Sequence, residues 1–119
     1  MMPNLTRLAA LSGLIAVALG AFGAHAIKDG LSVEALGWWD TATLYLLTHT
    51  AAALAIGLSG RGDLINKGGY TLLLGALLFA ATLYAMALGA PRWFGAITPI
   101  GGVAMLAGWS LILFGAKRN

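Results

Sequence analysis

The chain has 119 residues, of which 60% are hydrophobic and 9% charged, with a mean hydropathy of +0.87 and no cysteine. Soluble domains are about 45–50% apolar and about 25% charged, so this composition indicates one integral membrane domain over residues 1–119. The missing cysteines exclude disulfides, thiolate metal sites, iron–sulfur clusters and thiol catalysis. The net charge of +3 comes from basic residues scattered between apolar segments, which form no stripe that would bind nucleic acid.

Four apolar segments meet or approach the length of roughly 20 residues that a helix needs to cross a bilayer. Their predicted bounds are about 5–27, 41–58, 69–88 and 99–115. The sequence therefore predicts an all-α, polytopic membrane protein built as a bundle of four transmembrane helices.

The first segment combines an anchor with a packing face. Arg7, the apolar run and the "AHA" of residues 24–26 imitate a cleavable secretory signal, but we expect the segment to be retained as a bundle member. Small residues let membrane helices approach closely. We therefore expect the small residues that recur every four positions to contact a neighbouring helix: Ser12, Ala16, Gly20 and Ala24.

The second segment carries a histidine near the middle of the bilayer. His49 lies about eight residues inside it, which corresponds to roughly 12 Å of helix. Asp40 or Thr41 is expected to cap this helix. An unpaired polar group is costly in lipid, so the small and polar side chains near His49 are expected to point into the bundle. They are Trp38, Thr41, Tyr45, Thr48, His49 and Ala52.

In the third segment, Ala81, Ala85 and Gly89 form the expected packing face. In the fourth, the expected packing residues are Gly101, Ala104, Gly108 and Gly115, and Thr98 before Pro99 is the predicted N-cap. Aromatic rings favour the headgroup level, where we expect Trp38, Trp39, Trp93 and Phe94.

The basic residues predict the orientation. With four crossings, both termini share a side of the membrane with the loop between the second and third segments. That side carries Arg7, Arg61, Lys67, Lys117 and Arg118, whereas the other carries Lys28 and Arg92 alongside Asp29, Glu34 and Asp40. The positive-inside rule therefore predicts that both termini are cytoplasmic.

Four polar residues converge in the outer half of the predicted bundle, and we expect His25, Tyr45, His49 and Tyr84 to line a small cavity that opens outward. His49 could instead serve only as a hydrogen-bonding link between helices. A second hypothesis is that His49 binds a ligand or transfers protons, and a third is that it binds a metal or haem. Haem needs two axial ligands at one depth, but His25 and His49 differ by very roughly 10 Å in depth.

No metal, cofactor or catalytic residue is expected. The acidic residues belong to loops or span ends, so they cannot complete a metal site with His49. Paired carboxylates, a nucleophile elbow and a zinc-protease helix motif are all missing from the sequence.

Four motifs together carry a family resemblance. They are "LGAFGAH" at residues 19–25, "GWWDTATLYLLTHT" at 37–50, "LY" followed by "AL" within 83–88, and "TPIGGVAMLAGW" at 98–109. Over nearly the whole chain they resemble the transmembrane protein 256-like family, also called domain of unknown function 423. The resemblance implies a four-helix protein of bacterial inner membranes and related organelles, with no established activity. Its recurrent polar positions map to His25, Tyr45, His49 and Tyr84, while Leu46 stands where relatives often have glutamine.

The expected function is that of a non-enzymatic structural or accessory component of the inner membrane, which self-associates or joins a membrane complex. A small-solute or proton carrier or channel with an outward-facing cavity around His49 is the alternative, and a haem-binding electron carrier is the second alternative. A continuous polar path through the inner half would favour transport. Residues 51–58 of the second segment have no polar side chain, which favours the accessory component.

Overall fold

The computed structural model describes residues 4–116, apart from the side chains of residues 26–28. This part of the chain forms four long helices and no strand: α1 (Leu5–Phe22), α2 (Val33–Ser59), α3 (Asp63–Ala87) and α4 (Thr98–Ala116). A π-helical turn, η1 (Gly23–Ile27), and a 3-10 turn, η2 (Lys28–Gly30), join α1 to α2, and the 3-10 turn η3 (Arg92–Ala96) precedes α4. Four helices are long and apolar enough to cross a membrane, which confirms the predicted all-α architecture.

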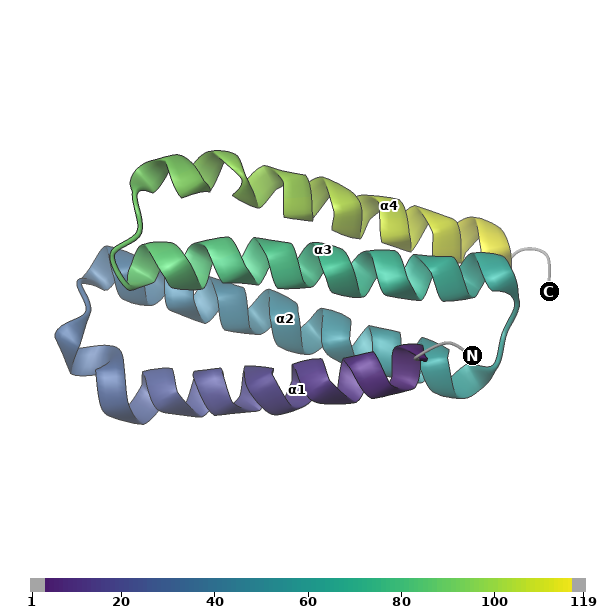
Figure 1. Ribbon diagram of the computed structural model, residues 1–119, viewed down its shortest axis with the longest axis horizontal. Helices are drawn as coiled ribbons and strands as arrows, with labels where there is room; N and C mark the ends of the chain where they lie inside the picture. Colours follow the sequence, from purple (N-terminus) through teal and green to yellow (C-terminus); the bar gives the residue numbers. More distant parts are fainter. Residues whose placement is uncertain (1–3, 117–119) are drawn as a thin grey trace.

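The four helices do not form a closed bundle in which α1 packs against α4. Helix α3 packs against α2 and α4, and α1 packs mainly on α2, so that α1 and α4 lie on opposite sides of the molecule (Figure 1). Helix α1 begins and α4 ends at one end of the bundle, together with the α2–α3 connection; we call this the terminal end. The distal end holds the connections from α1 to α2 and from α3 to α4.

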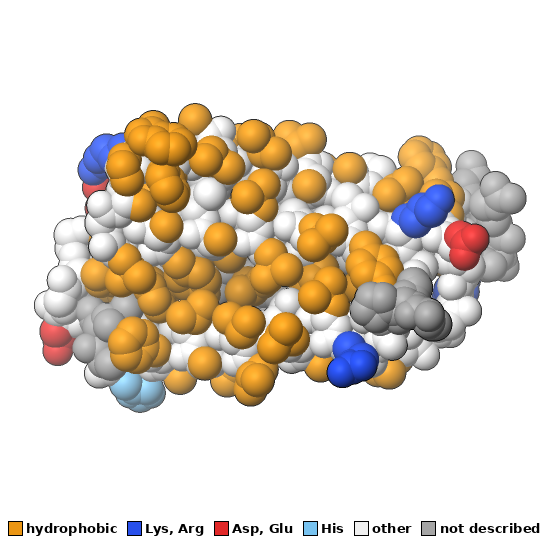
Figure 2. Space-filling model, in the orientation of Figure 1, with side chains coloured by type: hydrophobic (Ala, Val, Ile, Leu, Met, Phe, Trp, Pro, Cys, Tyr) orange, Lys and Arg blue, Asp and Glu red, His pale blue; other side chains and the backbone are white. Residues whose placement is uncertain are grey.

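Charged side chains lie toward the two ends, while hydrophobic side chains cover the middle of the face shown in Figure 2. Described residues of the terminal end include Arg7, Arg61, Asp63 and Lys67, and those of the distal end include Asp29, Glu34, Asp40 and Arg92. Lys117 and Arg118 lie outside the described residues. An uncharged belt between two charged ends suits a bilayer-spanning bundle.

Two helices begin earlier than hydropathy predicts. Helix α2 starts at Val33, where the Ser32 hydroxyl accepts a hydrogen bond from the Ala35 N–H at 3.0 Å. Asp40 is therefore an exposed residue inside the helix, and the predicted cap at Asp40 or Thr41 is wrong. Helix α3 likewise starts at Asp63. Hydropathy marks the part of a helix that lies in hydrocarbon, whereas both helices continue through polar residues beyond it.

Helix α4 also begins differently from the prediction. The Thr98 hydroxyl lies 2.7 Å from the Thr82 hydroxyl of α3, and it donates to the Phe94 carbonyl at 3.4 Å. Thr98 is the first residue of α4, and its side chain ties this helix to α3 and η3 instead of capping it. The predicted N-cap role is therefore wrong.

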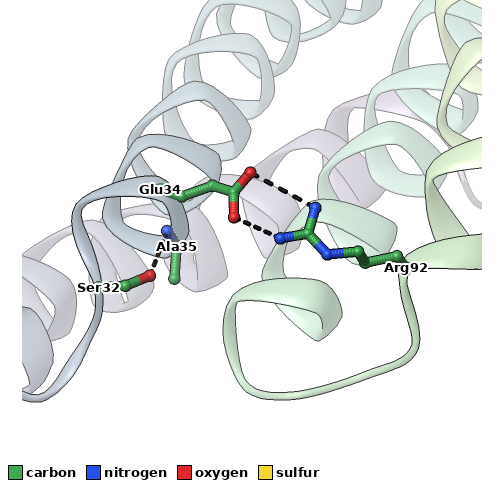
Figure 3. Close-up of polar contacts among 4 residues, drawn as sticks. All are labelled: Ser32, Glu34, Ala35 and Arg92. Carbon is green, nitrogen blue, oxygen red and sulfur yellow. Dashed lines mark hydrogen bonds and ion pairs between the residues drawn. The ribbon is translucent and has the colours of Figure 1, made fainter.

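An ion pair joins η3 to the start of α2 at the distal end (Figure 3). Arg92 of η3 donates to both carboxylate oxygens of Glu34, at 2.6 and 3.4 Å, and its guanidinium lies 5.4 Å from the centre of a Trp38 ring. Both charged side chains are more than half exposed, so the pair adds little to stability. Its structural effect is to hold η3 against the start of α2.

Helix α1 packs along a line that advances by four and then three residues. Leu5, Ala9, Ser12 and Ala16 are buried on this line. Of the predicted packing residues, Ser12 and Ala16 are buried and Gly20 is half-buried, but Ala24 is exposed. Residues that repeat every four positions move gradually around the helix surface, because a helical turn has 3.6 residues. Residues spaced by four and three in alternation stay on the side that faces a neighbouring helix at a small crossing angle. The prediction for Ala24 is therefore corrected.

The Trp39 side chain is buried inside the bundle, next to Asp40 of the charged distal end. Its side chain is 2% exposed, its indole N–H donates to the Leu19 carbonyl at 2.9 Å, and its ring meets Tyr84 edge-on at 4.5 Å. A Cβ at Gly23 would lie 2.6 Å from the Trp39 Cδ1, so the indole occupies the space that Gly23 leaves. Trp93 is 64% exposed, as a headgroup position requires.

Helices α3 and α4 touch backbone to backbone. Gly75 of α3 and Gly101 of α4 face each other: a Cβ at Gly101 would lie 2.6 Å from the Phe79 nitrogen, and one at Gly75 would lie 2.9 Å from the Gly101 carbonyl oxygen. Glycines that make such close contacts recur every seven residues, at Gly68 and Gly75 and at Gly101, Gly108 and Gly115. This spacing is typical of a seam between two coiled helices.

The predicted packing residues Gly101 and Gly108 of the fourth segment are both buried in this seam. The face predicted for the third segment is wrong, because Ala81 and Gly89 are exposed and Ala85 is only half-buried. The glycines of α3 that contact α4 are Gly68 and Gly75. Gly68 precedes the predicted third segment, and Gly75 lies among leucines.

Candidate functional site

A cavity of about 480 Å³ lies between α2 and α4, with α3 contributing to its wall. Its volume falls within the roughly 300–1,000 Å³ of small-molecule sites. The α4 wall runs from Pro99 to Trp109, which is about 15 Å of helix. The lining is mostly apolar and consists of Tyr45, His49, Phe79, Pro99, Gly102, Val103, Met105, Leu106 and Trp109.

His49 links the two helices at one edge of this cavity. Its side chain is 8% exposed, the Trp109 indole Nε1–H donates to its Nε2 at 3.1 Å, and its Nδ1 lies 2.9 Å from the Tyr45 carbonyl oxygen. An indole nitrogen can only donate and a carbonyl oxygen can only accept. Nε2 is therefore the acceptor and Nδ1 carries the proton, so the hydrogen bonds select a neutral imidazole of one tautomer.

The rest of the surroundings of His49 fit this assignment. Thr48 donates its hydroxyl to the Leu44 carbonyl at 2.8 Å and places the same oxygen 3.1 Å from His49 Nδ1. The Tyr45 ring stacks on the imidazole with centroids 5.9 Å apart, and the Trp109 ring meets it edge-on at 5.7 Å. Both imidazole nitrogens thus have partners, and His49 acts as a hydrogen-bonded bridge from α2 to α4.

Only two of the four predicted cavity residues share this site. Tyr45 and His49 line the cavity, but the Tyr84 hydroxyl lies 2.6 Å from that of Thr43, and its ring packs on Trp39 away from α4. His25 is exposed in η1 at the distal end. The expected four-residue cavity is thereby corrected, and the two histidines are not brought together as a shared axial pair on haem would require.

The predicted inward stripe of α2 is also corrected. His49 is buried, but Thr41 and Thr48 are exposed and Tyr45 is 40% exposed. The buried line of α2 consists instead of Ala35, Trp39, Ala42, Leu46, His49 and Ala53. Because a threonine hydroxyl can bond to a carbonyl of its own helix, as Thr48 does, it does not need a partner helix to be satisfied.

Sequence reasoning missed the contribution of α4 to the site. Trp109 lies well inside α4, whereas tryptophan in membrane proteins favours the two interfaces. A tryptophan deep in a span needs a partner for its N–H group. The position of Trp109 deep in the fourth segment was therefore a sequence signal for a hydrogen-bond partner inside the membrane. That partner is His49 of α2.

Comparison with known proteins identifies the family. Residues 19–102 match the model of the family described as protein of unknown function (DUF423). The chain belongs to this family. The UPF0382 membrane protein of Staphylococcus saprophyticus is 43% identical over 113 residues, which cover 93% of this chain and 94% of that relative. The UPF0382 inner membrane protein YgdD of Escherichia coli is 42% identical over 113 residues, covering 92% and 86%.

A third DUF423 relative, the UPF0382 membrane protein of Haemophilus influenzae, is 43% identical over 116 residues, covering 94% of this chain and 92% of its own. No solved structure matches. The resemblance seen in the sequence motifs is thus confirmed. This DUF423 protein is a multi-pass integral protein of the cell membrane, which in the Escherichia coli relative is named as the inner membrane.

The bond between His49 and Trp109 gives the first testable prediction. A double-mutant cycle with His49→Ala and Trp109→Phe should yield a coupling energy of about 0.6–1.7 kcal/mol, the size of interhelical hydrogen bonds in membranes. Unfolding by SDS in mixed micelles, followed by circular dichroism, measures it. Trp93→Phe, at an exposed distal ring, should show no coupling to His49→Ala. A coupling energy of zero for Trp109 would contradict the bridge.

Proposed function

We propose that this DUF423 protein is a non-enzymatic membrane component that works by associating with another membrane-spanning chain, in the simplest case a second copy of itself. The supporting observation is the exposed face of α2, opposite its buried line. This face, which we call the small-residue face, is rich in small side chains at alternating spacings of four and three. It consists of Gly37, Thr41, Leu44, Thr48, Ala51 and Ala55.

The contrast with the other exposed helix faces supports an interface on α2. The outward side of α1 carries Leu11, Leu14 and Val17, and exposed positions of α4 outside the cavity carry Ile100, Leu113 and Phe114. Large apolar side chains of this kind suit contact with lipid chains. Small residues bring two helix backbones into close van der Waals contact, which drives the association of membrane helices.

A second copy fits the geometry of this face. Two copies inserted in the same direction can be related by a twofold axis along the membrane normal, which pairs the small-residue face with itself. The spacing of four and three residues favours the shallow left-handed crossing of about +20° that is common in membrane bundles. We place the terminal end, with Arg7, Arg61 and Lys67, in the cytoplasm, as the positive-inside rule favours.

A proton carrier ranks second. It would use His49 as the group that takes up and passes on a proton. In the observed arrangement Nε2 already accepts the Trp109 N–H and Nδ1 faces a carbonyl, so each transfer would first have to break the α2–α4 bridge. A haem carrier ranks third, because His25 and His49 lie apart.

Association can be tested by energy transfer in liposomes. Because the chain contains no cysteine, Arg61→Cys provides a single labelling position for donor and acceptor dyes. Labelled copies should show energy transfer that depends on the protein-to-lipid ratio. Ala51→Ile or Ala55→Ile should weaken association by about tenfold, equivalent to about 1.4 kcal/mol, because the added side chain separates the backbones.

The matched control for this experiment is Ala18→Ile, which adds the same side chain at an exposed alanine of α1. It should leave energy transfer unchanged. Energy transfer at the level of random proximity in the parent protein, or equal losses in all three isoleucine variants, would refute an interface on the small-residue face.

A further inference from the structure

We infer that the cavity between α2 and α4 binds an apolar, lipid-phase molecule that carries a carbonyl oxygen. The inference concerns a face of α2 different from the small-residue face, so it stands independently of the proposed association. It rests on the one polar group of the cavity that the protein leaves unused, on the depth of that group, and on the shape of the apolar space beside it.

The unused group is the hydroxyl of Tyr45. The polar atoms of His49 and Trp109 are bonded to each other and to the Tyr45 backbone. The Tyr45 hydroxyl, in contrast, makes no hydrogen bond within residues 4–116, although its ring is held by Phe79 at 4.8 Å and by His49 at 5.9 Å. Tyr45 is therefore the lining residue that offers an unused hydrogen-bond donor to a molecule in the cavity.

The depth of Tyr45 limits its possible partners. Tyr45 lies five residues, about 7.5 Å, beyond Asp40 of the charged distal end, so its ring lies in the outer part of the hydrocarbon layer. An unpaired donor is costly there. The acceptors available at this level are carbonyl oxygens, either the ester carbonyl of a phospholipid or a carbonyl that an apolar molecule carries into the layer.

A carbonyl meets this need at the lowest cost. It accepts without bringing a second donor that would also need a partner, and a partly satisfied carbonyl oxygen is tolerated better than an orphaned N–H group. The remaining wall is apolar, with Val103, Met105 and Leu106 on α4 and the ring of Phe79 on α3. A Cβ at Gly102 would meet nothing within 4 Å, so the absence of a side chain there keeps part of the volume open.

The experiment measures binding in nanodiscs of defined lipid composition, as the shift of the thermal midpoint of the protein with added probe. Decylubiquinone supplies a ring carbonyl and 8-pentadecanone a chain carbonyl. Their counterparts without a carbonyl are n-decylbenzene and pentadecane. We expect at least one carbonyl probe to raise the midpoint in a saturable manner, with its counterpart bound more weakly. The choice between the two carbonyl probes then distinguishes a planar ring from a flexible chain as the natural ligand.

Two variants locate the site. Tyr45→Phe keeps the ring and removes the donor, and it should weaken binding of the carbonyl probe about 5-fold, as expected for one hydrogen bond, without affecting the counterpart. Gly102→Leu fills the cavity and should abolish the shift. Ala107→Leu places the same side chain on an exposed position of α4 outside the cavity and should bind as the parent protein does.

Three results would overturn the inference. The first is that no carbonyl probe shifts the midpoint. The second is that each carbonyl probe and its counterpart bind equally and Tyr45→Phe changes neither, which would mean that the cavity is filled by any chain. The third is that Gly102→Leu binds as Ala107→Leu does, which would place the probe elsewhere. None of these results bears on energy transfer between copies, so the inference and the proposed association can fail separately.

Discussion

Trp39→Ala should lower the free energy of unfolding by about 3–5 kcal/mol, the range seen when a buried large aromatic side chain is removed. Trp39 is the bulkiest of the fully buried side chains, and it joins three helices. It fills the space beside Gly23 of η1, meets Tyr84 of α3 and donates to the Leu19 carbonyl of α1. The loss is measured by SDS titration in mixed micelles with circular dichroism.

Two variants separate the contributions of Trp39. Trp39→Phe keeps most of the ring contact but leaves the Leu19 carbonyl without its indole donor, so it should cost less, about 1–3 kcal/mol. Trp93→Ala removes an indole that is 64% exposed and should change stability little. If Trp39→Ala were no more harmful than Trp93→Ala, the assignment of Trp39 to the core would be incorrect.

The second large effect is expected at the contact between α3 and α4. Gly101→Leu should destabilise the protein by about 3 kcal/mol, at the upper end for overpacking, because its Cβ would meet the backbone of α3 at Phe79 and Gly75. Backbone atoms cannot move aside as a flexible side chain can, so α4 would have to separate from α3. The same SDS titration reports the change.

The adjacent residue provides the control. Gly102→Leu adds an identical side chain one position along α4, where a Cβ has open space, so it should leave the free energy of unfolding nearly unchanged. The two variants share composition, helix propensity and depth in the membrane. Equal destabilisation by both would show that loss of glycine itself, and not the close contact of α3 and α4, causes the effect.

Hydropathy alone was sufficient to predict that the chain forms four membrane helices, because hydrocarbon thickness sets a minimum apolar length. It could not predict that α2 begins at Val33, since a helix continues through residues such as Glu34 and Asp40 once it leaves the hydrocarbon. The Ser32 cap was the available signal. Hydropathy also could not show that the Trp39 ring points between the helices, because burial by neighbouring helices depends on packing and not on depth.

The side of each helix that faces its neighbours was harder to predict than the position of its residues along the membrane normal. Small residues occur on all sides of α2, so composition does not distinguish the buried line of α2 from the small-residue face. Depth correctly grouped Tyr45 with His49, and these two residues do share the cavity. Tyr84 lies on the Trp39 side of α3, and the position of α4 at its glycine seam brings Trp109 to His49.

The length of α2 has a consequence for its position in the bilayer. Its 27 residues extend about 40 Å, whereas the hydrocarbon layer is about 30 Å thick. The apolar part of α2, residues 41–58, spans about 27 Å and matches the layer, so its first turns, with Glu34 and Asp40, project from it. Because the ion pair between Glu34 and Arg92 joins η3 to those turns, the start of α4 lies beside them at the distal surface of the membrane.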